Sequence, residues 1–145
     1  MNVRIKENPE FEKNDVLIEC KQKNSDIDTA AEILRHSGST VVGNIENTSF
    51  IVRLTDILYF ESVDKTGFFY TEDKVYRTEL RLYEAEENFK IHHFIRISKS
   101  MVVNMLKIDE ISPYLAGRMR LKLTNGEFIV VSRQYAQNIR HELGI

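Results

Sequence analysis

The stretch "FIRISKSMVVN", residues 94–104, decides how the second half of the chain folds, because its alternation of apolar and polar residues breaks in the middle. On one regular strand its two isoleucines, Met101 and Val103 would share a face, and Lys99 would lie on that same face. A lysine is almost never fully buried unless it is paired. The pattern therefore predicts two core-forming strands and, between them, a break that lifts Ser98-Lys99-Ser100 out of the sheet.

Length and composition indicate one globular domain, since 145 residues that are 42% hydrophobic and 29% charged can bury a sizeable core. A single cysteine, Cys20, excludes an internal disulfide and a cysteine-based zinc cluster. The N-terminus lacks the apolar core of a signal peptide, and no apolar run is long enough to cross a bilayer. We therefore expect a soluble, cytoplasmic protein.

Positive charge is concentrated in the last third of the chain. The net charge is −2, but residues 91–145 carry 8 basic and 4 acidic side chains. Such asymmetry can create an anion-binding face on an acidic protein. By itself it also fits a solvated surface with chance clustering.

The first half reads as a small β–α element followed by strands. Val16–Cys20 is predicted to be a strand and residues 25–38 a helix that Asp26 or Asp28 can cap. A β-hairpin is expected around Gly43–Ser49, and short strands follow through residue 77. The segment "TELRLYEAEENF" then predicts a helix with Thr78 as its N-cap.

The segment "RMRLKLTNGEFIVVSR", residues 118–133, predicts a hairpin with a two-residue loop at Asn125-Gly126. That register puts one set of apolar side chains in the core: Met119, Leu121, Leu123, Phe128 and Val130. It puts a basic set on the opposite face: Arg118, Arg120 and Lys122, with Arg133 at the end. Ser132 is a candidate cap for a last helix whose apolar stripe is Tyr135, Ile139 and Leu143.

These elements give an α+β fold in which antiparallel strands dominate, with one helix inserted and one at the C-terminus. We expect residues 1–43 to be a strand-helix extension and residues 44–145 to be the main domain.

The sequence holds no constellation for catalysis. The adjacent His92 and His93 would point to opposite faces of a strand, and the glutamates of "EAEEN" read as a solvated helix face. No phosphate-binding glycine loop or nucleophile motif is present. We therefore predict no enzyme activity, metal, cofactor or small-molecule substrate. An aromatic ligand pocket at Tyr59, Phe60, Phe68 and Phe69 is a weaker reading, because these side chains are more simply core.

Basic residues instead stand where strands end. Lys65 lies in the "VDKTG" loop, Lys99 in the predicted break, and Arg133 at a strand-to-helix junction. Lysine and arginine at such points suit contact with phosphate, and arginine can also donate two bonds to guanine.

Three blocks in order resemble the LytTR family of DNA-binding domains: "DILYFES" from Asp56, "FIRISKSMVVN", and "LTNGEFIVVSRQY" up to Tyr135. The second block is similar to the family pattern F-x-R-x-H-R-S, two apolar-rich positions, and then V-N. The resemblance runs from about Asn44 to Leu143.

The resemblance implies that strand-linking loops, and not a recognition helix, enter the major grooves of double-stranded DNA. Carried over to this chain, the implied DNA-binding residues are Lys65, Thr66, Ser98, Lys99, Ser100, Arg118, Arg120 and Arg133. Three positions depart from the family. Ser98 and Lys99 stand where histidine and arginine are usual, and Gly67 stands where some members place a base-contacting side chain.

The resemblance further implies a stand-alone, response-regulator-like transcription factor without a receiver domain, held in check by a small membrane protein. We expect a homodimer on repeated half-sites, because one small module rarely gives enough specificity. The alternative is a protein-interaction module that docks a membrane or cytosolic partner and whose DNA binding is weak or lost.

Overall fold

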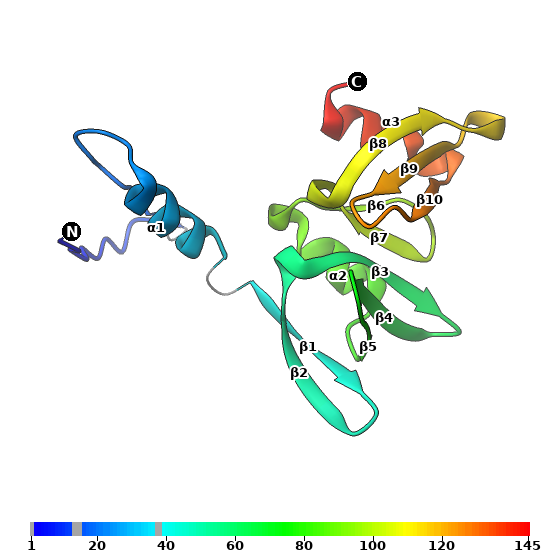
Figure 1. Cartoon of the computed structure of the whole chain (residues 1–145), viewed down its shortest axis with the longest axis horizontal. Helices are drawn as coiled ribbons and strands as arrows, with labels where there is room; N and C mark the ends of the chain where they lie inside the picture. The colour runs from blue at the N-terminus through cyan, green and yellow to red at the C-terminus, as the bar shows by residue number, and fades with distance from the viewer. Residues whose placement is uncertain (1, 13–15, 37–38) are drawn as a thin grey trace. The chain divides into compact units, whose positions relative to one another are not determined.

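The computed structural model describes residues 2–12, 16–36 and 39–145. Their contacts divide the chain into two compact units, Met1–Ser37 and Gly38–Ile145 (Figure 1). The expected extension, residues 1–43, includes the first four residues of a strand, Thr40–Ile45, that pairs within the second unit.

The first unit contains one helix, α1 (Ser25–His36), in its described part, and this confirms the predicted helix. The side-chain oxygen of Asn24 accepts a hydrogen bond from the N–H of Ile27 at 3.0 Å, so Asn24 caps the helix and the expected aspartate caps are wrong. The predicted strand at residues 16–20 is also wrong. This segment is largely exposed and pairs with no strand of the described residues. A lone strand would leave its backbone groups without ladder partners.

The second unit is built mainly of short antiparallel strands. Their bounds are β1 (Thr40–Ile45), β2 (Thr48–Arg53), β3 (Ile57–Val63), β4 (Thr66–Thr71), β5 (Val75–Thr78), β6 (Phe94–Arg96), β7 (Met101–Asn104), β8 (Ile108–Pro113), β9 (Met119–Leu123) and β10 (Phe128–Val131). Its α-helices are α2 (Leu82–Asn88) and α3 (Arg133–Leu143). Single 3₁₀ turns cover Leu54–Asp56, Lys90–His92, Met105–Lys107 and Leu115–Gly117. The strand-dominated α+β class is confirmed.

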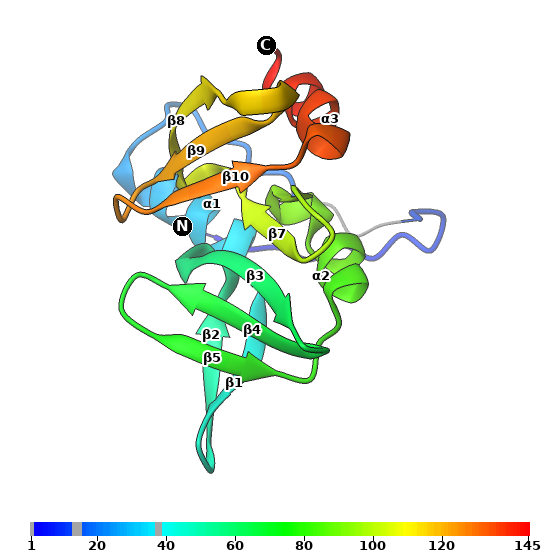
Figure 2. The ribbon, with the colours of Figure 1, turned by 90° about the vertical axis from the view of Figure 1, so that its right-hand side faces the viewer.

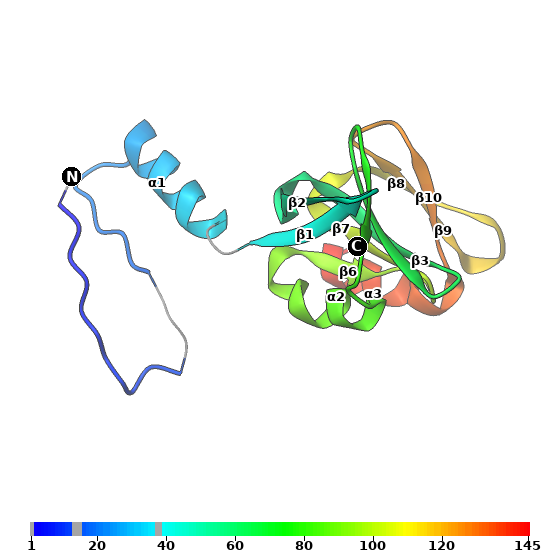
Figure 3. The same cartoon turned by 90° about the horizontal axis from the view of Figure 1, so that it is seen from below.

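The strands form two sheets. The larger has seven strands in the order β2-β1-β5-β4-β3-β7-β6, and the smaller has three in the order β10-β9-β8. In Figure 2 the small sheet and the β1–β2 hairpin lie at opposite ends of this unit, with β3 and β7 between them. Figure 3 shows the same unit from below, with α2 and α3 along one side of it. The expected hairpin at Gly43–Ser49 is confirmed, since β1 and β2 pair from Thr40 with Arg53 to Ile45 with Thr48. The sequence pattern did not predict β8.

Each face of the larger sheet has its own core. One core packs this sheet against α2, and its buried members include Ile57, Phe60, Phe69, Phe94 and Val102. The other packs it against the small sheet and α3, and includes Leu58, Tyr59, Ile97, Leu121, Val131 and Ile139. The aromatic side chains Tyr59, Phe60 and Phe69 are therefore core, as expected, whereas Phe68 is only half-buried.

The β9–β10 hairpin is real, but its predicted register is wrong by one residue. Leu121 pairs with Ile129, and the N–H of Leu123 donates to the carbonyl of Glu127, so three residues form the loop. The shift turns the opposite face of β10 inward. Met119, Leu121 and Leu123 are buried as predicted, but Phe128 and Val130 are 53% and 38% exposed.

The predicted break in "FIRISKSMVVN" is confirmed, since β6 ends at Arg96 and β7 begins at Met101. Two cap assignments differ from expectation. Thr78 ends β5 and its hydroxyl accepts from the N–H of Leu80, so it does not cap α2. Ser132 precedes α3, but its side chain makes no capping bond.

Candidate nucleic-acid interface

Three connecting segments meet at one end of the second unit. They are the 64–65 turn between β3 and β4, the 97–100 break between β6 and β7, and the 132–133 junction between β10 and α3. Antiparallel pairing brings the first two together, because Glu61 near the end of β3 lies opposite Met101 at the start of β7. The N–H of Ser62 also donates to the carbonyl of Ser100 at 2.9 Å.

The third segment is attached to the break by a bond between the two sheets. The backbone N–H of Ser132 donates to the carbonyl of Ile97 at 2.9 Å. Val131 pairs with Met119, so Arg118 enters β9 opposite the 132–133 junction. Hydrogen bonds therefore place all three segments, and Arg118 beside them, at one edge.

The 64–65 turn is tight and strained. Asp64 and Lys65 have φ of 49° and 65°, which is the left-handed conformation that a two-residue hairpin turn requires and that glycine or asparagine adopts more easily. Lys65 is exposed, while Thr66 is half-buried as the first residue of β4.

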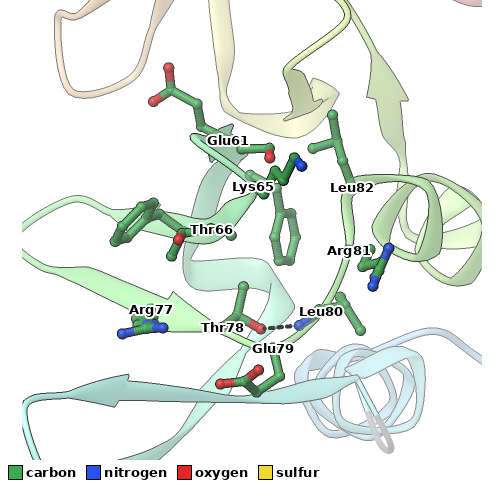
Figure 4. Close-up of a pocket in the computed structure, with 13 residues that line it drawn as sticks. Glu61, Lys65, Thr66, Arg77, Thr78, Glu79, Leu80, Arg81 and Leu82 are labelled. Atoms are coloured by element: carbon green, nitrogen blue, oxygen red, sulfur yellow. Dashed lines mark hydrogen bonds between the residues drawn. The ribbon is translucent and has the colours of Figure 1, made fainter.

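A cleft of about 660 Å³ lies beside this turn, between β3–β4 and the segment that joins β5 to α2. Figure 4 shows the ammonium group of Lys65 directed toward Leu82 across it. Gly67 lies at the base of this region, and a Cβ there would sit 2.7 Å from the carbonyl oxygen of Leu80. The close backbone approach explains why this chain has no side chain at the position.

The 97–100 break presents its polar residues outward. Ile97 is fully buried and its N–H donates to the carbonyl of Met101, which closes the loop at its base. The hydroxyl of Ser98 accepts from the N–H of Ser100 at 3.2 Å, and Lys99 and Ser100 are exposed.

Arg133 begins α3 and is exposed at the edge of the site. Its aliphatic part packs over Gly117, where a Cβ would lie 3.0 Å from both Cγ and Cδ of the arginine. Arg118 is more constrained, because its Nε donates to the carbonyl of Leu115 at 3.0 Å and its guanidinium lies 4.8 Å from the ring centre of Tyr114.

Arg120 lies apart from the three segments. It is two residues further along β9, about 7 Å from Arg118 at ordinary strand rise, on the outer face of the small sheet. Its guanidinium lies 4.6 Å from the ring centre of Phe128. The structure thus brings together four basic residues at one end of the second unit: Lys65, Lys99, Arg118 and Arg133. It leaves Arg120 on the outer face of the small sheet.

Within the described ranges, no group of three or more histidine, cysteine or acidic side chains could hold a metal ion. No helix in the same ranges has the length and apolar character needed to cross a membrane.

Comparison with known proteins identifies the family. A family model described as the LytTr DNA-binding domain matches residues 47–144. This chain belongs to the LytTR family of DNA-binding domains. It is 33% identical over 106 residues to a protein of Staphylococcus aureus strain NCTC 8325 / PS 47 named as an HTH-type transcriptional regulator, and this match covers 73% of the chain and 71% of that relative. A relative in strain MRSA252 with the same type of name is 32% identical over the same length.

A solved structure agrees with these sequence matches. The LytTr DNA-binding domain of a Bacillus cereus protein described as a methyl-accepting/DNA response regulator superposes with a TM-score of 0.70 at 29% identity. The match covers 74% of this chain and 98% of that one. The LytTR fold expected from the three sequence blocks is therefore confirmed.

Proposed function

We propose that this chain is a sequence-specific transcriptional regulator that inserts strand-linking loops of its second unit into the major grooves of DNA. The observation that carries the proposal is the meeting of the 64–65 turn, the 97–100 break and the 132–133 junction, held by the Ser62–Ser100 and Ser132–Ile97 backbone bonds. In the described part of the chain, strands separate each α-helix from the next, so loops are the better candidates for groove contact than a helix pair.

Arg133 and Lys99 would contact bases or the adjacent phosphates. Both are exposed at the shared edge, and arginine presents the two-pronged donor that reads guanine. The remaining contacts would position the DNA backbone through Lys65, Thr66, Ser98, Ser100, Arg118 and Arg120. The backbone strain at Lys65, which a glycine would avoid, supports a role for its side chain.

The regulator would act in the cytoplasm as a homodimer on repeated half-sites, because one small module buries too little surface to select a site alone. A small membrane protein is the proposed inhibitory partner. On this proposal the chain is not an enzyme and takes no cofactor.

The deciding experiment is selection of bound DNA from a random double-stranded pool at low salt, followed by affinity measurements at several salt concentrations. A repeated motif should be enriched, and its affinity should fall linearly on logarithmic axes with a slope set by the number of phosphates contacted. A double variant, Lys99→Ala with Arg133→Ala, should enrich no motif. If the parent chain enriches none either, the proposal is wrong.

A protein-interaction module is the second candidate. It is favoured by apolar side chains of the first unit that are exposed, namely Val16 at 67%, Leu17 at 82% and Ile33 at 64%. If the selection yields no motif, and substituting these three by serine abolishes binding to a partner while the second unit stays folded, this candidate replaces the first.

A further inference from the structure

The side chain of Arg96, the last residue of β6, turns back onto the 97–100 break. Its Nε donates to the carbonyl oxygen of Ser98 and its Nη2 to that of Lys99, each at 2.6 Å. Its Nη1 lies 2.9 Å from a carboxylate oxygen of Glu86 on α2. Each nitrogen of the guanidinium is therefore engaged, and only 17% of the side chain is exposed.

The two carbonyls that Arg96 holds belong to consecutive peptide groups of the loop. In the described part of the chain, no backbone N–H donates to either of them. The guanidinium is a rigid planar fork, so two bonds from one such group fix the orientation of both peptides together. A lysine at this position would be a single point donor and could not do the same.

We propose that Arg96 is a positioning residue for DNA recognition, which holds the Ser98 and Lys99 carbonyls inward so that the Lys99 and Ser100 side chains face outward. The inference rests on the proposed DNA-binding function and adds a residue to it. Arg96 itself does not contact DNA, since its nitrogens are occupied within the protein. Glu86 orients the guanidinium and links the loop to α2.

The first test needs no DNA. Amide hydrogen exchange is measured in the full chain and in Arg96→Met, Arg96→Lys and Glu86→Gln variants. Both Arg96 variants should raise exchange in residues 97–100 by about tenfold or more, above all at the hydrogen-bonded N–H groups of Ile97 and Ser100. The reason is that the loop then opens locally while the rest stays closed. Glu86→Gln should raise exchange in the loop less, since the glutamine amide oxygen still accepts the hydrogen bond from Arg96. Arg53→Met removes an equally long basic side chain at the exposed end of β2 and should change nothing in the loop.

The second test uses the selected DNA motif. Arg96→Met should weaken binding about tenfold while leaving the salt slope unchanged, whereas Lys99→Ala should lower that slope by about 1. In a Lys99→Ala background, Arg96→Met should reduce the affinity for the motif much less than it does in the parent chain, because both changes remove the same contact.

Three results would overturn the proposal: unchanged exchange in residues 97–100, a salt slope that falls by about 1 in Arg96→Met, or full affinity in Arg96→Lys. Exchange in β3 separates a local change from loss of the fold, and Arg96→Lys takes the place of Arg96→Met if the latter does not fold. If the parent enriches no DNA motif, the proposed function fails, but the exchange measurement still decides whether Arg96 orders the loop.

Discussion

The backbone N–H of Ser132 donates to the carbonyl oxygen of Ile97, and this 2.9 Å bond joins the end of the small sheet to the break in the large one. Ile97 is fully buried, so the bond is anchored in the core on one side. On the other side it fixes the residue that precedes α3. The position of Arg133 relative to Lys99 is thus set by backbone and core, and not by contacts between the two side chains.

Replacing Arg133 by alanine should weaken binding to the selected DNA motif by on the order of 1–3 kcal/mol, if this arginine reads a base. The unfolding free energy should change little, because the side chain is exposed. Fluorescence anisotropy with labelled duplexes measures the first quantity, and urea unfolding measures the second.

The matched control is Arg53→Ala, which removes the same charge from the exposed end of β2. It should leave both quantities near the parent values. Equal binding of every duplex by Arg133→Ala and the parent would remove Arg133 from the site.

Gly117→Ala should weaken DNA binding without any change to a basic residue. Its Cβ would lie 3.0 Å from Cγ and Cδ of Arg133, so the arginine must move aside. The φ of +75° also adds about 1–2 kcal/mol of backbone strain.

Gly126→Ala separates these two effects. Its φ is +86°, but a Cβ there meets no atom within 4 Å. Urea unfolding should give a lower unfolding free energy for both variants than for the parent. Only Gly117→Ala should bind the motif more weakly. Equal affinities in the two would show that the Gly117 contact does not position Arg133.

The break at residues 97–100 could be predicted because a lysine on an apolar face is a physical conflict that a regular strand cannot relieve. The β9–β10 register could not be predicted in this way. Both faces of "FIVV" in β10 are apolar, so alternation does not say which one is buried. The register is set by the loop, in which Gly126 adopts a positive φ as the third residue. With this loop, the face of β10 that carries Ile129 and Val131 turns inward.

Other features depended on groups far apart in the sequence. The role of Arg96 requires Glu86 and the two loop carbonyls to be in place, and no local pattern signals that arrangement. The strand predicted at residues 16–20 is wrong for a related reason. Its composition suits a strand, but in the part of the chain that the structure describes no strand pairs with it.

Asn104→Ala should destabilise the fold by about 2–4 kcal/mol, since it removes two hydrogen bonds from a buried site. Asn104 is 2% exposed. Its Nδ2 donates to the carbonyl of Ile57 and its Oδ1 accepts from the N–H of Leu106, each at 3.0 Å. This pairing gives a structural reason for the asparagine that ends the "VVN" block.

Urea unfolding of Asn104→Ala measures the loss, and Asn47→Ala in the exposed β1–β2 turn is the control. Asn104→Asp should also destabilise, because it keeps the acceptor but removes the donor to Ile57. A value for Asn104→Ala within 0.5 kcal/mol of the control, the usual range for surface changes, would mean that the two bonds contribute little.

The unfolding free energy should fall as pH rises above 10, because Tyr59 titrates differently in the folded and unfolded chains. Its hydroxyl donates to the carboxylate of Glu127 at 2.7 Å. Burial raises the pKa of this phenol well above its ordinary value of 10.0, and the bond to Glu127 raises it further. Above pH 10 the unfolded chain releases this proton while the folded chain keeps it, so the unfolding free energy falls by up to about 1.4 kcal/mol per pH unit.

Unfolding in urea between pH 8 and pH 11 tests this linkage in the parent, in Tyr59→Phe and in a control, Tyr83→Phe. Tyr83 is 60% exposed. At pH 8 the unfolding free energy of Tyr59→Phe should be about 0.5–1.5 kcal/mol below that of the parent, because the substitution removes the hydrogen bond to Glu127. Above pH 10 the unfolding free energy of this variant should fall less steeply than that of the parent. Tyr83→Phe should follow the parent curve throughout. The same slope above pH 10 in Tyr59→Phe and the parent would show that another group, and not Tyr59, controls the alkaline loss.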